Sequence, residues 1–170
     1  MSAESAIRGD VAALRPATVD DAPRLCEILT SPETRDWWHG YDVERCRSDL
    51  ARPHVRGFMI EVDGADAGFI QYSEEDDPDY RHATIDIALH ADWHGRGIGT
   101  DAVRALARHL LNDLGHHRLT IDPALANKRA IRCYEKVGFR QVGVLRRYER
   151  GPDGIWHDSL LMDLLAEELR

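Results

Sequence analysis

The 170-residue chain is short of cysteine, of long apolar runs and of positive charge. Its three cysteines, Cys26, Cys46 and Cys133, are scattered and lack the spacing of metal ligands, so we expect reduced thiols in a cytoplasmic protein. No segment approaches the roughly 20 apolar residues that a membrane-spanning helix needs, which argues against a membrane partner. Residues 1–10 also lack the basic and then apolar layout of a signal peptide.

The acidic balance of the chain, a formal net charge of −8, argues against nucleic acid as the main partner, because phosphates attract faces rich in Lys and Arg. The same balance favours a small cationic molecule as ligand, although solubility alone would also explain it. Nine histidines are present, but none belongs to a His-Glu-x-x-His or similar motif, so no metal site is predicted. His116 and His117 stand at a predicted turn from helix to strand, where we expect them at the surface.

Length and composition suit one globular domain over residues 1–170, since 43% of the residues are hydrophobic and 31% are charged. Alternating apolar residues predict strands, and apolar residues at helical spacing predict helices. This order predicts an α/β (α+β) fold, a mixed sheet with helices on both faces. The acidic run at 73–80 predicts a mobile loop. The predicted strands are 11–15, 58–62, 65–72, 83–89, 118–121, 139–148 and 155–164, and the predicted helices are 19–30, 43–51, 100–114 and 128–137.

A glycine-rich stretch, residues 93–100, joins the strand at 83–89 to the next helix. Gly95, Gly97 and Gly99 allow a sharp turn that brings successive N–H groups to one side, at the opening of a helix. Such a loop can hold a phosphate, and a turn that binds nothing is the alternative. A P-loop is excluded because no lysine follows Gly99, and the G-x-G-x-G spacing does not fit a dinucleotide-binding fingerprint.

Two motifs together resemble the GCN5-related N-acetyltransferases (GNAT). The acyl-CoA loop of that family, Gln/Arg-x-x-Gly-x-Gly/Ala, falls on residues 94–99, with His94 at the first position in place of Gln or Arg. The second motif, N-x-x-A-(x)3-Y-(x)3-G-F, runs from Asn127 to Phe139. The resemblance implies a central mixed, mostly antiparallel sheet of six to seven strands. It also implies an acyl-CoA N-acyltransferase that moves an acetyl group from acetyl-CoA to a primary amine and needs no metal.

Within this family the chain is most similar to the aminoglycoside 6′-N-acetyltransferases, through segments 36–40, 68–72, 85–86, 120–127 and 129–136. The likeness implies a small cationic amine as acceptor, an aminoglycoside, and a role in antibiotic resistance. One alternative is the same chemistry on a siderophore precursor, another metabolic amine or a protein N-terminus. An acyl-CoA-binding module without catalysis is the other. A monomer and a homodimer are both compatible with the sequence.

The resemblance also implies roles for individual residues, each with a plainer alternative. Tyr134 matches the tyrosine that protonates the departing thiolate, and packing on the sheet is its alternative. Asn127 matches the residue that contacts pantetheine, and it also suits a helix cap. Asp86 is expected to act as the base, unless it simply faces solvent. Asp122 is expected to bind the substrate ammonium, although Asp before Pro also suits a turn.

The remaining expected contacts fall into two groups. Residues expected to hold acyl-CoA, besides Asn127, are Ile87, Ala88, Leu89, His94, Gly95, Arg96, Gly97, Ile98, Gly99 and Thr100. Their N–H groups would bind the pyrophosphate and the thioester carbonyl, and the strand edge would pair with the pantetheine. Trp37, Trp38 and Tyr72 are expected to form an apolar wall for the acceptor, with core packing as the alternative for the tryptophans.

Overall fold

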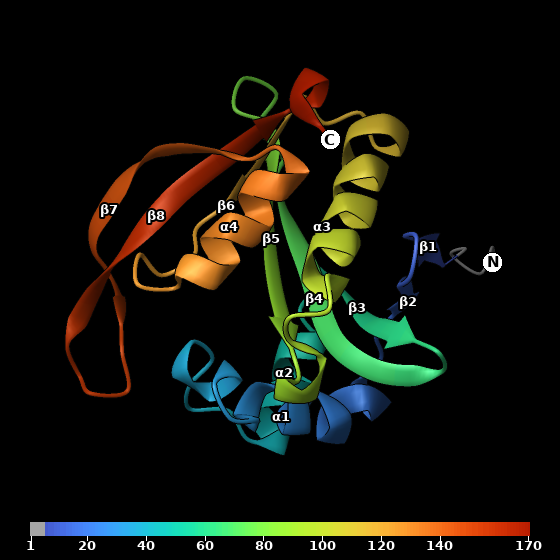
Figure 1. The fold of residues 1–170 in the computed structure, drawn as a ribbon, viewed down its shortest axis with the longest axis vertical. Coiled ribbons are helices and arrows are strands. Elements are labelled where there is room, and N and C mark those ends of the chain that lie inside the picture. Colours follow the sequence, from blue (N-terminus) through green and yellow to red (C-terminus); the bar gives the residue numbers. More distant parts are fainter. Residues whose placement is uncertain (1–5) are drawn as a thin grey trace.

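A computed structural model describes residues 6–170 (Figure 1). Within that range eight strands form one sheet in the order β1-β2-β3-β4-β5-β6-β8-β7. All neighbouring strands are antiparallel except β5 and β6, which are parallel. The strands are β1 (Ile7–Arg8), β2 (Ala13–Pro16), β3 (Val55–Val62), β4 (Ala65–Glu75), β5 (His82–Leu89), β6 (Arg118–Ile121), β7 (Arg140–Arg150) and β8 (Trp156–Leu165).

Four α-helices accompany this sheet in the described part of the chain: α1 (Ala22–Thr30), α2 (Val43–Leu50), α3 (Ile98–Arg108) and α4 (Lys128–Val137). Short helical turns are η1 (Val19–Asp21), η2 (Thr34–Asp36), η3 (Ala91–Trp93), η4 (His109–Asp113) and η5 (Ala166–Glu168). The predicted order is confirmed, with the two-residue β1 as an addition. Helix α3 begins two residues before the predicted start and passes at His109 into a π-helical turn.

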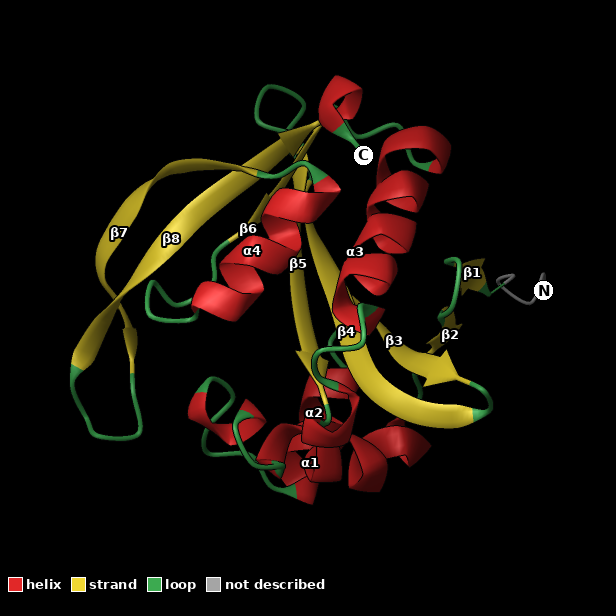
Figure 2. Cartoon of the chain, in the orientation of Figure 1, coloured by secondary structure: helices red, strands yellow, loops and turns green. Residues whose placement is uncertain are grey.

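Strand alternation divides the core between the two faces of the sheet. On one face Ile60, Ile70 and Ile85 are fully buried in the cluster that includes α3 and α4. On the other face Met59 and Phe69 pack in a second cluster with α1 and α2. Figure 2 shows α3 and α4 side by side in front of the sheet, with α1 and α2 gathered at one end of it. The prediction of helices on both faces is therefore confirmed.

At the C-terminal end of β4 two predictions were wrong, that of a loop from residue 73 and that of an exposed His116. Strand β4 continues to Glu75, so the first three residues of the run at 73–80 are strand and not loop. The carboxylate of Glu74 lies 2.7 Å from Nε2 of His116. His116, predicted at the surface, is only 2% exposed, whereas His117 is exposed as predicted. The chain folds back because the His116 N–H donates to the carbonyl of Leu110, and the carboxylate partner offsets the cost of burying an imidazole.

A buried carboxylate ties the start of α3 to the turn between β1 and β2. Asp101, 7% exposed, accepts the backbone N–H of Asp10 on Oδ1 and those of Val11 and Ala12 on Oδ2, all within 2.9 Å. Gly9 permits this approach, since a Cβ there would lie 2.3 Å from Oδ2. Burial alone would raise the pKa of Asp101, but the three N–H donors outweigh it and hold the pKa below its ordinary value.

We expect Asp101→Asn to lower the free energy of unfolding by about 2 kcal/mol. The amide NH₂ of asparagine would face a backbone N–H that now donates to a carboxylate oxygen, so two donors would meet without an acceptor. The native-state pKa is lowered, so this contribution is complete above about pH 4 and is lost as the pH falls through the native-state pKa. Urea unfolding at several pH values measures both effects. Asp113→Asn, at a side chain 67% exposed, is the matched control and should change stability by less than about 0.5 kcal/mol. Equal losses in both variants would contradict the assignment.

Candidate active site

Strands β5 and β6 separate soon after they meet. They share two residue pairs, Ala83 with Leu119 and Thr84 with Thr120. The hydroxyl oxygens of the two threonines lie 2.8 Å apart. Beyond this point β5 pairs with β4 alone, where Leu89 lies opposite Gly68 and the next residue donates its N–H to β4. In an antiparallel ladder this alternation directs the N–H and C=O groups of Leu89 away from β4. The last part of β5 therefore turns the N–H and C=O of Ile87 and the N–H of Leu89 to the open side, where the Leu89 carbonyl already accepts from Thr34 and His94.

The glycine loop lies at the end of this edge. Gly95 and Gly97 have φ values of 73° and 78°, a conformation that is strained for residues with a side chain. Gly97 is the N-cap of α3. A Cβ on either glycine would meet no atom within 4 Å, so the space in front of the loop is open. The first N–H groups of α3 have no carbonyl partner within the helix. The unpaired N–H groups at the start of α3 thus lie next to the open space in front of Gly95 and Gly97.

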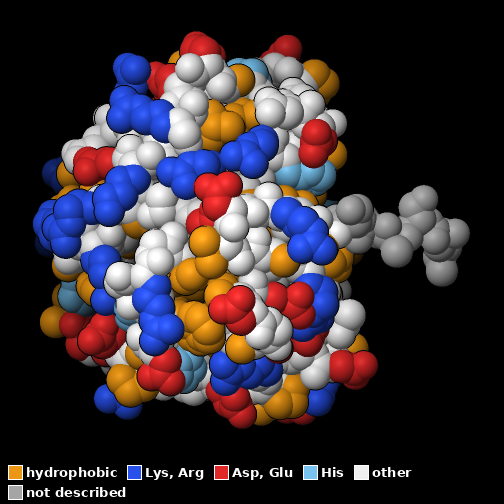
Figure 3. Space-filling view, turned by 45° about the vertical axis from the view of Figure 1, so that its right-hand side comes forward, with side chains coloured by type: hydrophobic (Ala, Val, Ile, Leu, Met, Phe, Trp, Pro, Cys, Tyr) orange, Lys and Arg blue, Asp and Glu red, His pale blue; other side chains and the backbone are white. Residues whose placement is uncertain are grey.

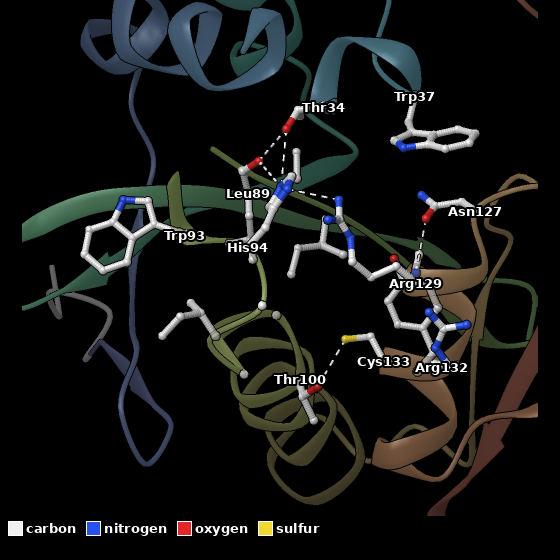
Figure 4. Close-up of a pocket in the computed structure, with 18 of the residues that line it drawn as sticks. Thr34, Trp37, Leu89, Trp93, His94, Thr100, Asn127, Arg129, Arg132 and Cys133 are labelled. Carbon is white, nitrogen blue, oxygen red and sulfur yellow. Dashed lines mark hydrogen bonds between the residues drawn. The ribbon is translucent and has the colours of Figure 1, made fainter. Parts of the chain in front are cut away.

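A cavity of about 270 Å³, here called the loop cavity, lies between β5, the glycine loop and α4 (Figure 4). Asn127 caps α4 through a hydrogen bond from the Ala130 N–H to its side-chain oxygen, and it also lines the cavity. Arg96 is the exception among the predicted residues of this group, since its guanidinium lies over the Trp93 ring and it is absent from the lining. The lining includes Ile87, Ala88, Leu89, His94, Gly95, Gly97, Ile98, Gly99, Thr100, Asn127, Cys133 and Tyr134.

Positive charge gathers beside the loop cavity although the chain is acidic. Lys and Arg side chains spread in a band across one face of the molecule (Figure 3). Arg129, Arg132 and Lys136 line the loop cavity from α4. The cavity therefore combines free N–H groups with cationic side chains, an environment that suits a phosphorylated ligand.

A second cavity, of about 650 Å³ and here called the carboxylate cavity, shares Tyr134, Ile87 and Asn127 with the first. Asp86 and Asp122 line it. Both predicted tryptophans, Trp37 and Trp38, also line the two cavities, and Trp38 packs against the second core cluster as well. The fold thus brings the predicted residues from four separate segments to one place, with Tyr134 where the two cavities meet.

The environment of Asp86 weakens its acidity. Burial, reinforced by the charge of Asp122 and then of Glu149, raises the pKa of Asp86 to about 6, against a weaker opposing effect of Gln71. The amide of Gln71 lies 3.4 Å from Oδ2 of Asp86. A carboxylate with this pKa is ionised at neutral pH and takes up a proton more readily than an ordinary aspartate does.

Asp122 and Tyr148 form a second polar pair in the carboxylate cavity. Burial raises the pKa of Asp122, and a hydrogen bond from the Tyr148 hydroxyl partly offsets this effect. Tyr148 and Glu149 lie on β7, and neither was predicted to belong to the site. The strand pattern places β7 correctly, but nothing in it indicates which of its side chains reach a site built around α4.

Tyr134 is 6% exposed and lines both cavities. Burial, followed by the charges of Cys133, Asp86 and Asp122, raises the pKa of its hydroxyl well above the ordinary value. The hydroxyl therefore keeps its proton at physiological pH and is able to donate it.

Tyr72, predicted to line the acceptor site, lies in the core instead. It is 7% exposed, stacks on Phe58 with ring centroids 6.3 Å apart, and is absent from the lining of the cavities described. The strand period explains the error: Gln71, one residue earlier, points into the carboxylate cavity, so Tyr72 must point to the opposite face.

Among residues 6–170, no group of three or more His, Cys, Asp or Glu side chains is placed to hold a metal ion. In the same range the helices are all too short or too polar to span a bilayer. The three cysteines are free thiols, and that of Cys133 lies 3.2 Å from the Thr100 hydroxyl.

Similarity to known proteins agrees with this geometry. Aminoglycoside N(6′)-acetyltransferase type 1 of Klebsiella pneumoniae is 32% identical over 165 residues, which cover 85% of this chain and 80% of the relative. Spermidine N(1)-acetyltransferase of Escherichia coli is 26% identical over 139 residues, covering 78% and 74%. The solved structure of AAC(6′)-Ib in complex with paromomycin and acetyl-CoA superposes with a TM-score of 0.77 at 30% identity, over 94% of this chain and 96% of that one.

A family model, that of the acetyltransferase (GNAT) domain, matches residues 12–140. This range contains both motifs and all of β2 to α4. The chain therefore belongs to the GNAT acetyltransferase family.

Proposed function

We propose that this acetyltransferase moves an acetyl group from acetyl-CoA to the 6′-amine of an aminoglycoside, and so confers resistance to such antibiotics. One observation carries the proposal. A cavity with phosphate-binding features and a cavity with two carboxylates meet at a buried, protonated tyrosine, Tyr134. Acetyl transfer to a cationic amine requires this combination of a site for the anionic donor, a base for the amine and an acid for the leaving thiolate.

The loop cavity would hold acetyl-CoA, which supplies the reactive thioester. The N–H groups from Gly97 to Thr100 suit its pyrophosphate, because they stand at a helix N-terminus and a Cβ on Gly97 would meet no atom within 4 Å. On the open edge of β5 the N–H and C=O of Ile87 and the N–H of Leu89 suit the amides of pantetheine, which would pair with them as an added strand. An N–H of the same edge would stabilise the negative charge that develops on the thioester oxygen.

The carboxylate cavity would hold the acceptor. An amine with a pKa near that of lysine, about 10, arrives protonated and must lose a proton before it can attack. Asp86 would accept this proton, directly or through water, while Asp122 binds the ammonium group. As the new C–N bond forms and the C–S bond breaks, the Tyr134 hydroxyl would give its proton to the departing thiolate.

The size and charge of the acceptor region support a substrate larger than a simple amine. A third cavity of about 830 Å³ under the β7–β8 hairpin shares Trp37, His39, Glu149 and Trp156 with the carboxylate cavity. Aromatic faces suit sugar rings, and carboxylates suit their ammonium groups. A linear polyamine is the alternative acceptor, supported by the similarity to a spermidine N(1)-acetyltransferase.

A substrate panel tests the acceptor. We expect the protein to release CoA thiol from acetyl-CoA with aminoglycosides that have a free 6′-amine and not with matched compounds that carry a 6′-hydroxyl. Spermidine serves as the comparison for the alternative. Binding of acetyl-CoA without turnover of any aminoglycoside would reject the antibiotic assignment and leave the donor site in place.

We expect Tyr134→Phe to lower kcat by about a hundredfold, because the thiolate would leave without a proton donor. The Kd for CoA should stay within about twofold, since phenylalanine keeps the packing of the ring. Stopped-flow turnover and calorimetry measure the two quantities. Tyr80→Phe, at a side chain that is 74% exposed, is the matched control and should behave as wild type. An unchanged kcat in Tyr134→Phe would remove its role as acid.

We expect Asp86→Asn to lower kcat/KM by about a hundredfold at pH 8 and to flatten its pH profile. In the wild type the base must be ionised, so kcat/KM should fall as the pH drops through about 6, the raised pKa of Asp86. In kcat the same limb should move to lower pH, because a bound ammonium favours the carboxylate. Asp92→Asn, at a side chain 81% exposed, is the control. A limb near pH 6 that persists in Asp86→Asn would place the base elsewhere.

A further inference from the structure

Arg129, to which neither the motifs nor the proposed reaction assigns a role, reaches from the first turn of α4 across the loop cavity. Its Nη1 lies 3.1 Å from Oε2 of Glu33. Its Nη2 lies 2.9 Å from Nδ1 of His94, and Figure 4 shows these two side chains pointing toward one another. Glu33 follows α1, and His94 opens the glycine loop. These three residues, here called the arginine clamp, thus connect three elements beside the cavity.

The partners of His94 determine which contact in the clamp is strong. Nε2 lies 3.0 Å from the Leu89 carbonyl oxygen, and a carbonyl only accepts, so Nε2 carries the proton of the neutral ring. Nδ1 is then an acceptor for Arg129, and Glu33, 3.3 Å away, receives no hydrogen from it. In the neutral-ring state Glu33 is therefore held by the guanidinium of Arg129 alone.

The backbone conformation of Glu33 is unfavourable for a residue with a side chain. Its φ of 66° places a residue with a side chain in the left-handed region. Its side chain is 64% exposed, and that of Arg129 is 50% exposed. The guanidinium of Arg129 is the main cause that holds the pKa of the Glu33 carboxyl below its ordinary value, so the carboxylate is charged at any pH at which the enzyme would work. The guanidinium of Arg129, which lines the loop cavity, is therefore already paired with a charged carboxylate.

We propose that Glu33 is an internal competitor for Arg129, and that a phosphate group of acyl-CoA displaces it when the donor binds. This inference rests on the proposed use of acyl-CoA in the loop cavity. A guanidinium presents two parallel N–H donors, which fit two oxygens of a phosphate as well as they fit a carboxylate. Arg129 is then a further phosphate-binding residue, and Glu33 lowers the affinity for any donor whose phosphate cannot replace it.

The exchange needs little movement of the chain. Arg129 already lines the cavity together with Arg132 and Lys136, so its guanidinium only has to turn from Glu33 towards the ligand. His94 keeps its bond to the Leu89 carbonyl throughout, and Thr34 holds the same carbonyl with its hydroxyl at 2.6 Å. The end of β5 therefore stays in place while the clamp changes partner.

Calorimetric titration with CoA, and with pantetheine as a probe without phosphate, tests the clamp. We expect Glu33→Gln to bind CoA about threefold tighter than wild type, since the exposed ion pair no longer competes, and to bind pantetheine equally. Arg129→Gln should bind CoA about tenfold more weakly, because it loses a charged hydrogen bond to phosphate. Glu44→Gln removes the same charge from an exposed residue of α2 that pairs with Arg47, and should leave CoA affinity unchanged.

The double variant Glu33→Gln/Arg129→Gln separates the clamp from a general effect of charge. If Glu33 acts through Arg129, the double variant should bind CoA as Arg129→Gln does. An equal gain from Glu33→Gln in both backgrounds would overturn the proposal, because a carboxylate that merely repels phosphate acts without Arg129. Equal CoA affinity of Glu33→Gln and wild type would overturn it as well. Absence of CoA binding by the wild type would instead reject the proposed donor site, and the clamp with it.

Discussion

The brevity of the pairing between β5 and β6 determines the rest of the site. Two residue pairs join these parallel strands before they part, whereas β5 is paired with β4 along the whole length of β5. In the described part of the chain, the backbone of β5 from Ile87 onward is therefore held by β4 on one side, while on the other side the Leu89 carbonyl is bonded to Thr34 and His94 and the groups before it lie open. The cost of unpaired backbone groups is small at a cavity that admits water, and it is recovered when a ligand with amide groups pairs with them. The glycine loop and α4 border the same opening, so one divergence of strands positions both motifs.

Electrostatic asymmetry across this opening matches the two substrates of the proposed reaction. Arg129, Arg132 and Lys136 stand on the side of the glycine loop, and Asp86 and Asp122 stand on the other side of Tyr134. The two carboxylates lie close enough that Asp122 contributes to the raised pKa of Asp86. A cationic acceptor would relieve this repulsion, and a phosphorylated donor would neutralise the arginines. Each half of the site is thus less favourable alone than with its ligand, and the arginine clamp is a local case in which a protein carboxylate already provides part of that neutralisation.

Local pattern predicted the elements well because burial dictates periodicity. The limits of β6 and α4 agree with the prediction, and those of β5 differ by one residue. The errors occurred where a side chain's face or partner depends on distant residues. Tyr72 faces the core because β4 exposes Gln71 to the carboxylate cavity, and His116 is buried because a carboxylate on β4 comes to meet it. Local sequence does not specify which face of β4 lines the cavity or which carboxylate meets His116. The roles of Tyr148 and Glu149 were missed for the same reason, since an exposed hairpin strand carries no local sign of what it leans over.

The sequence by itself determined the glycine loop, the capped helix with Asn127 and Tyr134, and the strand that carries Asp86, because backbone conformation at glycine, helix capping and strand alternation depend on near neighbours. The resemblance of their motifs to the GNAT family already implied an acyl-CoA enzyme. Only the tertiary structure decided that Asp86, Asp122, Trp37 and Tyr134 share one place, that Asp86 has a raised pKa, and that Glu33 holds Arg129 across the cavity. Those properties arise from burial and from charges brought together over as many as 96 positions of sequence, and such contacts exist only once the sheet has formed.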